Sequence, residues 1–210
     1  MIAKSPVRFL ALIIVLASGI AWAEGNAPEA LVKDVTDQVL AVLRQDKDIQ
    51  SGNRQRAMSV IETKVAPHFD FTRMTGLATG RAWQQASPSQ REALSTQFRT
   101  LLVRTYANAL IAYRDQTVSF KPSPPQKGDD VTVRSQINKP GGESIAIDYS
   151  LAKTQGDWKV YDVAIAGVSL VTNYRSTFAT EVQKGGVDGL LKSLQEKNHH
   201  LEEAHGKPTA

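Results

Sequence analysis

Cysteine is absent from the 210-residue sequence, and this absence excludes several kinds of chemistry at once. The chain cannot form a disulfide, use a thiolate nucleophile, bind zinc through cysteine or act as a thiol redox carrier. Stability must therefore come from the hydrophobic core alone, and a single domain of this length can bury a substantial one.

Long apolar runs are also scarce, and the longest lies at the N-terminus. Lys4 and Arg8 precede the apolar segment Phe9–Ile20, which is shorter than the ~20 residues of a comfortable membrane span. Ala21 and Ala23 then form a small-x-small cleavage pattern, so we expect a signal peptide, residues 1–23, cleaved after Ala23. An uncleaved anchor is the alternative. No cysteine follows the apolar segment, which excludes a lipoprotein anchor.

The chain also lacks a large excess of positive or negative charge. Loss of residues 1–23 removes Lys4 and Arg8, leaves 187 residues, and lowers the formal net charge from +4 to +2. No block of basic residues and no acidic tail occurs, which gives little support for nucleic-acid binding. The GxGxxG, GxxxxGK[ST], GxSxG and HExxH patterns are also missing, so the commonest nucleotide, serine-hydrolase and zinc-protease sites are not indicated.

Helical periodicity fills the first half of the chain. The segment Pro28–Ile49 has an apolar stripe and a proline that suits a first helical turn. Asn53 is placed to cap the helix that follows, and Asp70 to cap a short helix over Phe71–Ala78. We expect a helical part over residues 27–114.

The longest predicted helix follows Ser87 and runs to about Arg114. Ser87 is the N-cap, and Gln90 completes a capping box. Apolar residues cover more than a narrow stripe of this helix. Either it is covered on two sides, or one side faces a cavity, and the pattern alone does not separate these arrangements.

Strand periodicity begins at Thr117. The segments Val131–Asn138 and Glu143–Thr154 alternate apolar and polar residues, and short turns join them to a further strand starting near Trp158. In this last strand we expect Tyr161 and Val163 on the core face and Val160 on the other face. The predicted fold is α+β: a curved antiparallel sheet of about four strands, over residues 117–166, cupped by N-terminal and C-terminal helices and enclosing an apolar pocket.

The C-terminal part reads as two helices and a tail. Ser169 is the N-cap of the first, Gly185 and Gly186 separate it from the second, and the helices occupy residues 168–198. The histidines beyond Asn198 belong to a polar tail, 199–210, that we expect to be frayed rather than a metal site. Residues 24–198 thus form one domain.

Acid–base residues give only weak indications of catalysis. His68 and Asp70 flank Phe69, but Asp70 is better explained as a cap. A cone-shaped α+β scaffold could place Tyr149, Tyr161 and Asp162 as in a ketosteroid isomerase, but Tyr161 and Asp162 should point to opposite faces. We therefore do not expect an enzyme, and we expect neither a metal nor a cofactor.

Two motifs resemble those of the MlaC family, also called the toluene-tolerance or ABC-transport auxiliary family. The first is YDV at 161–163, GVSLV at 167–171 and NYRSxF at 173–178; the second is VAPHFDF at 65–71 with Met74, Ala82, Trp83, Gln90 and Phe98. The resemblance extends over nearly the whole chain after the signal peptide. It implies a monomeric periplasmic carrier that binds phospholipid tails in an apolar pocket. Its implied partners are an outer-membrane lipoprotein–porin complex and an inner-membrane MCE-domain ABC transporter complex, and its implied role is outer-membrane lipid asymmetry.

The resemblance also suggests which residues contact the lipid. Candidate pocket walls are the apolar side chains Leu77, Trp83, Phe98, Leu102, Tyr106, Leu110, Val133, Ile137, Ile147, Tyr149, Tyr161, Val163, Val168, Val171 and Tyr174. Candidate head-group contacts are Arg81, Arg104 and Arg175. A periplasmic chaperone or adaptor, or a small-molecule enzyme, is the alternative function.

Overall fold

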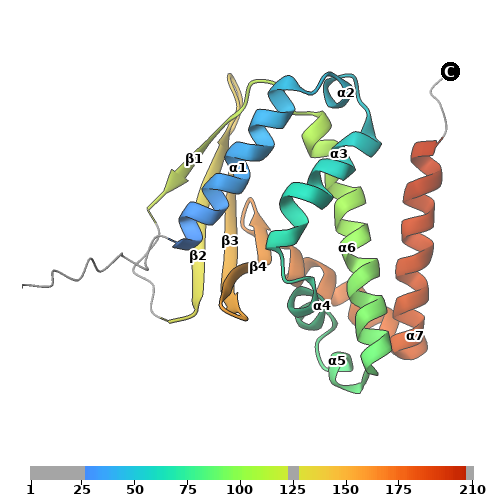
Figure 1. The fold of residues 1–210 in the computed structure, drawn as a ribbon. Coiled ribbons are helices and arrows are strands. Elements are labelled where there is room, and N and C mark those ends of the chain that lie inside the picture. The colour runs from blue at the N-terminus through green and yellow to red at the C-terminus, as the bar shows by residue number, and fades with distance from the viewer. Residues whose placement is uncertain (1–26, 123–127, 207–210) are drawn as a thin grey trace, which may run out of the picture.

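The structure is a computed structural model that describes residues 27–122 and 128–206 (Figure 1). The predicted signal peptide and its cleavage site lie outside these residues. The helical part comprises α1 (Ala27–Gln45), α2 (Lys47–Gln50), α3 (Arg54–Val60), the π-helical turn η2 (Ile61–Val65), the 3-10 turn η3 (Ala66–His68), α4 (Phe71–Thr79), α5 (Ala82–Gln85) and α6 (Pro88–Ile111). The strands β1 (Thr117–Lys121), β2 (Asp130–Asn138), β3 (Ile145–Thr154), β4 (Asp157–Ile165) and β5 (Val168–Ser169) follow, and then α7 (Leu170–Gly206).

The five strands form one antiparallel sheet in the order β1-β2-β3-β4-β5, which confirms the α+β class and adds a short strand to the four expected. Ala166 and Gly167 connect β4 to β5 with φ of 50° and 83°. A two-residue turn with both φ values positive matches the twist of antiparallel strands. Ala166 and Gly167 thus form a tight hairpin that leads through β5 directly into α7.

The expected alternation of β4 is wrong at its centre, because a β-bulge interrupts the pairing with β3. Ser150 pairs with Asp162 and Leu151 with Val160, so Tyr161 has no partner of its own. A bulge inserts one residue and reverses the faces on one side of it. Val160 therefore lies on the core face with Val163, each less than a tenth exposed, and it takes the place predicted for Tyr161.

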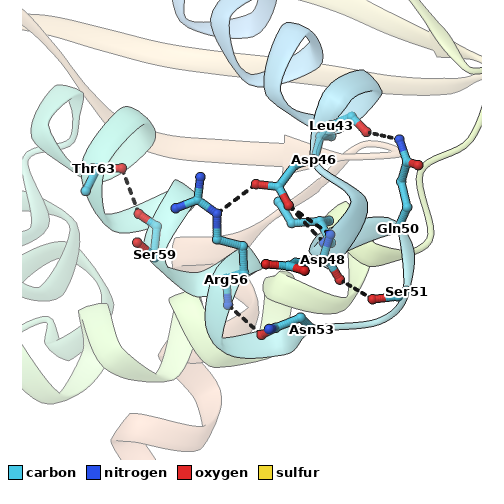
Figure 2. A network of polar contacts seen from close by, with 10 residues as sticks. Leu43, Asp46, Asp48, Gln50, Ser51, Asn53, Arg56, Ser59 and Thr63 are labelled. Carbon is cyan, nitrogen blue, oxygen red and sulfur yellow. Dashed lines mark hydrogen bonds and ion pairs between the residues drawn. The ribbon is translucent and has the colours of Figure 1, made fainter.

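The helix expected over Pro28–Ile49 is two helices with a break at Asp46 (Figure 2). The Asp46 carboxylate accepts hydrogen bonds from the backbone N–H groups of Asp48 and Ile49, and one from Arg56 Nε at 2.7 Å. These bonds hold the pKa of Asp46 below its ordinary value, Arg56 contributing most. An aspartate that caps the next turn therefore ends α1 earlier than the apolar pattern suggests.

Other predicted helix caps are confirmed. Asn53 Oδ1 accepts the N–H of Arg56 at 3.0 Å, and Asp70 Oδ1 accepts the N–H of Arg73 at 2.8 Å. Ser87 and Gln90 form the reciprocal capping box, although α6 ends at Ile111 instead of near Arg114. These caps depend on contacts within a few residues, which is why the sequence reveals them.

The C-terminal helix is longer than predicted. Non-helical backbone at Gly185 and Gly186 divides α7 at the expected place, but the second part continues past Asn198 to Gly206. The imidazoles of His199 and His200 lie 3.5 and 3.7 Å from the Glu203 carboxylate, one helical turn away. The expectation of a frayed tail is therefore wrong for residues 199–206, while residues 207–210 lie outside the described part.

Helix α6 is the centre of the apolar interior, with α7 along one side and α3 on another (Figure 1). Its Leu94, Phe98 and Leu101 belong to a core shared with the sheet, α4 and α7. Val103 and Ala107 belong to a second core with α1, α2 and α3. In the described residues no helix is both long and apolar enough to cross a bilayer.

Candidate functional site

Two adjoining apolar cavities lie between the sheet and the helices. Their volumes are about 250 and 220 Å³, and they share the wall residues Val65, Phe69, Ile137 and Tyr149. Figure 1 shows α1 lying across the strands of the sheet. Most protein cores contain few voids larger than a water molecule, so adjoining cavities of this size indicate a space built for a ligand.

The first cavity lies under α1. Helix α1 contributes one long side of its wall, and the sheet, the end of α6 and the segment from η2 to Phe69 contribute the rest. The lining is Leu31, Val32, Val35, Thr36, Val39, Leu40, Val65, His68, Phe69, Leu110, Val118, Ile137, Tyr149 and Val160. The second lies deeper, among η2, α4, α6 and the sheet. Its lining is Ile61, Val65, Ala66, Phe69, Phe71, Met74, Leu102, Val103, Tyr106, Ile137, Ile147, Tyr149, Val163, Ile165 and Leu170.

The irregular backbone from η2 to Phe69 forms the wall between the two cavities. A π-helical turn, such as η2, is rare and often occurs at functional sites. After η3 the chain meets the sheet, where Phe69 forms a bridge with Val160 and the Asp70 N–H donates to Val160 O at 2.8 Å. This bridge fixes Phe69 between the cavities, where its ring stacks on Phe71 at 5.5 Å.

The cavity walls carry almost no charge. None of the residues that line either cavity is Asp, Glu, Lys or Arg. Burial raises the pKa of the Tyr149 and Tyr106 phenols, and burial together with Lys159 lowers the pKa of His68. These shifts favour the neutral forms at neutral pH. The Thr36 hydroxyl donates a hydrogen bond to the Val32 carbonyl at 2.7 Å, so it does not offer a donor to a ligand. Such walls suit hydrocarbon and disfavour an ionic ligand.

A family comparison agrees with this geometry: the model of the MlaC protein family matches residues 33–196. The chain belongs to the MlaC family. It is 23% identical over 178 residues to a toluene tolerance protein, ttg2D, of Pseudomonas putida, covering 84% of this chain and 83% of that protein. It is 24% identical over 178 residues to the intermembrane phospholipid transport system binding protein MlaC of Haemophilus influenzae, covering 81% and 82%.

A solved MlaC-like fold matches more closely. The phospholipid-binding protein of Ralstonia solanacearum, solved in complex with a phospholipid, is 42% identical to this chain. The two structures superpose with a TM-score of 0.78, over 83% of this chain and 98% of the other. The arrangement of sheet and helices in this MlaC-family chain is therefore that of a protein solved with a phospholipid.

About half of the predicted wall residues line the cavities of this MlaC-family chain. They come from α6 and from the core face of the sheet, and they are Leu102, Tyr106, Leu110, Ile137, Ile147, Tyr149 and Val163. Of these, Ile137 and Tyr149 border both cavities. Residues of one helix and three strands, far apart in the sequence, thus meet at one space.

Four other candidates lie in filled core. Phe98 makes edge contacts with Tyr174 and Phe178 at ring-centroid distances of 4.9 and 5.0 Å. Val133 and Val171 are 2% and 4% exposed and line neither cavity. In these places the apolar pattern produces packing between α6, α7 and the sheet instead of a lining.

The remaining wall candidates lie toward the surface. The bulge turns Tyr161 outward: its hydroxyl donates to Asp130 at 2.6 Å, and the Arg73 guanidinium lies 3.7 Å from the ring centroid. Val168 is 57% exposed in the short strand β5. Leu77 and Trp83 line a separate, open hollow between α4, α5 and α7 that shares no lining residue with the two cavities.

The three candidate head-group arginines are not at the cavities either. Arg104 is directed to the C-terminal part of α7, where it bonds to the Asn198 carbonyl and lies 3.1 Å from the Glu202 carboxylate. Arg81 and Arg175 line the open hollow, and Arg175 donates twice to the Leu77 carbonyl.

The sequence reading missed the contribution of α1 and of Phe69. Helix α1 supplies Leu31, Val35 and Val39 to the first cavity. The stripe of α1 was visible, but an apolar stripe has the same appearance over a packed core and over a cavity. Phe69 stands in the family motif over residues 65–71, and that motif was the signal that pointed to it.

The carboxylates of Asp162 and Asp70 form hydrogen bonds that stabilise the fold. Asp162 accepts hydrogen bonds from the Ser169 hydroxyl at 2.5 Å and from the Val171 N–H at 3.1 Å, so it fastens β4 to the start of α7. Asp70 caps α4 and accepts a bond from Thr154 at 3.1 Å. Within residues 27–122 and 128–206 no group of three or more His, Asp or Glu side chains could hold a metal ion.

Proposed function

We propose that this chain is a periplasmic phospholipid carrier, without a catalytic step, that holds acyl chains in the paired cavities and leaves the head group in solvent. The observation that carries the proposal is the pair of adjoining apolar cavities with uncharged walls. Membership of the MlaC family and the phospholipid in the related Ralstonia structure support it.

The energetics of lipid in water explain why a carrier is needed. Each methylene moved from water to an apolar site gains roughly 0.8 kcal/mol. For a diacyl lipid with ~30 methylenes, the free energy of moving the tails from a membrane into water would therefore be unfavourable by roughly 24 kcal/mol. Walls made of aliphatic and aromatic side chains offset this cost, whereas a buried phosphate would lose its own hydration without a partner.

The same proposal includes the route of the lipid. We assign the donor and the acceptor to an outer-membrane lipoprotein–porin complex and an inner-membrane MCE-domain ABC transporter complex, so that the carrier contributes to the lipid asymmetry of the outer membrane. The name of the Haemophilus relative, a binding protein of an intermembrane phospholipid transport system, supports this route. A carrier working between two membranes needs neither a resident cofactor nor a second copy of itself, so we assign it a monomeric state.

Mass spectrometry of the protein purified from a bacterial periplasm tests the proposal. Native spectra should show a mass above that of the mature chain, and organic extraction should release phospholipid in stoichiometric amount. Protein that is empty after purification, and stays empty after incubation with phospholipid vesicles, would contradict the carrier function. It would favour an adaptor or chaperone, and measurable turnover of a small molecule would favour an enzyme.

A further inference from the structure

The open hollow between α4, α5 and the first part of α7 is not used by the lipid cavities. Its volume is about 1010 Å³, and it shares no lining residue with either cavity. Leu77 is 37% exposed at its edge, and the half-buried Trp83 forms part of its wall. A hollow of this size that is open to solvent is shaped to receive a protruding segment of another protein, not a flat membrane surface.

The apolar part of the hollow is held in place by close packing. A Cβ atom at Gly76 would lie 3.1 Å from the Trp83 ring, so any larger residue there would crowd the ring against α4. The Arg91 guanidinium lies 5.6 Å from the centroid of the same ring, and Arg91 Nε donates to the Trp83 carbonyl at 2.9 Å. The tryptophan is therefore preorganised, which lowers the entropy lost when a partner binds.

The charge around the hollow is positive. Three arginines line it, Arg73, Arg81 and Arg175, against one carboxylate, Asp70, which already caps α4. Arg73 is paired with Asp130 at 2.9 Å. Arg175 bonds only to a backbone carbonyl, and Arg81 has no side-chain hydrogen bond or ion pair within the described residues. Two guanidinium groups thus face solvent without a carboxylate partner.

We propose that this hollow is the docking surface for an acidic protein segment of a membrane complex that exchanges lipid with the carrier, an inference that rests on the proposed function. A half-buried tryptophan and an exposed leucine beside arginines form a composition that is common in protein interfaces, and unpaired arginines attract carboxylates. The position also suits lipid exchange, because α4 separates the two spaces. Leu77 and Gly76 line the hollow, while Phe71 and Met74 of the same helix line the second cavity.

The test compares lipid delivery to two acceptors. Protein loaded with a fluorescent phospholipid is mixed with protein-free vesicles of phosphatidylethanolamine and phosphatidylglycerol, or with native envelope vesicles that contain the membrane complexes. The wild-type protein should deliver faster to native vesicles. Arg81→Glu should reduce this excess about tenfold, because it removes electrostatic attraction and adds repulsion, and it should leave delivery to protein-free vesicles unchanged. Raising the ionic strength to about 0.15 M should also reduce the excess for the wild-type protein.

Arg134→Glu is the matched control. Arg134 is an exposed arginine of β2 and does not line the hollow. It should behave as the wild-type protein. Equal loss by Arg81→Glu with both acceptors would assign the arginine to the lipid head group and overturn the docking proposal. Unchanged delivery to both acceptors would overturn it as well. Wild-type protein that takes up no lipid would instead contradict the carrier function itself.

Discussion

Two regions of the interior are both apolar, but their side chains pack differently. Between α6 and α7, the rings of Phe98, Tyr174 and Phe178 fill the space, and Phe98 and Phe178 are 0% and 2% exposed. Between α1 and the sheet, Phe69, Ile137 and Tyr149 border open volume on both sides. The difference is that α7 packs directly along α6, whereas the first cavity lies between α1 and the sheet.

The comparison teaches that cavity walls and core walls cannot be told apart by residue type. Leu101 and Leu102 are neighbours on α6; both are buried, at 1% and 6% exposure. Only Leu102 lines a cavity. The cost of truncating a buried side chain depends on how much packing it loses, so the two leucines should differ in energetic importance.

Truncation of these two leucines gives the largest expected effect. Leu101→Ala should lower the free energy of unfolding of the lipid-free protein by about 4 kcal/mol, near the upper part of the range for buried leucine. Leu102→Ala should cost about 2 kcal/mol, because its side chain already borders a void. Urea denaturation of both variants measures the difference. Equal losses would mean that the second cavity is closed in solution.

A charge in the shared wall should separate lipid loading from folding. Ile137→Asp places a carboxylate at the border of both cavities, where an acyl chain offers it no hydrogen-bond donor. We expect at least about a tenfold loss of copurifying phospholipid, since even 1.4 kcal/mol of lost binding is a factor of ten. Native mass spectrometry reports the occupancy, and circular dichroism reports the fold.

Ile137→Leu is the control for that variant, because it keeps the volume and the apolar character of the wall. It should retain its lipid. Full occupancy in Ile137→Asp would show that the acyl chains do not lie in these cavities. A folded but empty Ile137→Leu would show that the site is sensitive to side-chain shape and not to charge.

These variants also show how far the sequence could predict the molecule. The caps at Asn53, Asp70 and Ser87 depend on groups three residues apart, so they were predictable. The α+β class was predictable from the change of period at Thr117.

The face of Tyr161 was not predictable, because the bulge beside it depends on the pairing of β4 with β3. The distinction between Val171 in filled core and Val163 at a cavity also depends on how elements distant in the chain pack together. The local sequence pattern thus predicts the helices and strands, and the family motif predicts a phospholipid ligand. Which apolar residues line a cavity and which fill the core depends on the three-dimensional packing.

Filling one cavity should change which lipids are bound without abolishing binding. Val39 of α1 lines the first cavity and not the second. Val39→Trp adds a large ring to a volume of about 250 Å³, so the bound phospholipids should have acyl chains shorter by a few methylenes, each of which contributes roughly 0.8 kcal/mol. Mass spectrometry of the extracted lipids measures the distribution of chain lengths.

Gln38→Trp is the control, since it adds the same ring one residue earlier on the exposed face of α1. It should leave the chain lengths unchanged. An unchanged distribution in Val39→Trp as well would mean that the first cavity is not occupied by a tail, and that the deeper cavity alone holds the ligand.

The smallest expected effect is an alkaline loss of stability that depends on bound lipid. Burial raises the pKa of Tyr149 above its ordinary value of 10.0, with a hydrogen bond to Ser135 opposing the shift in part. A phenol whose pKa is higher in the folded state contributes no pH dependence below pH 10. Above it, the unfolded chain loses its proton first, so stability falls as pH rises. Acyl chains in the cavities should exclude further water from Tyr149 and steepen this fall.

Urea titrations between pH 9 and pH 11, with lipid-loaded and lipid-free protein, measure this difference in slope (a range set by the ordinary tyrosine pKa of about 10). Tyr149→Phe should abolish the dependence of the slope on lipid, because the group that titrates at the cavity is gone. Tyr174→Phe should keep it, since Tyr174, whose pKa is also raised by burial, lies in the filled region between α6 and α7. The reverse result would place the lipid beside Tyr174, and the filled region would then be the one that opens to admit it.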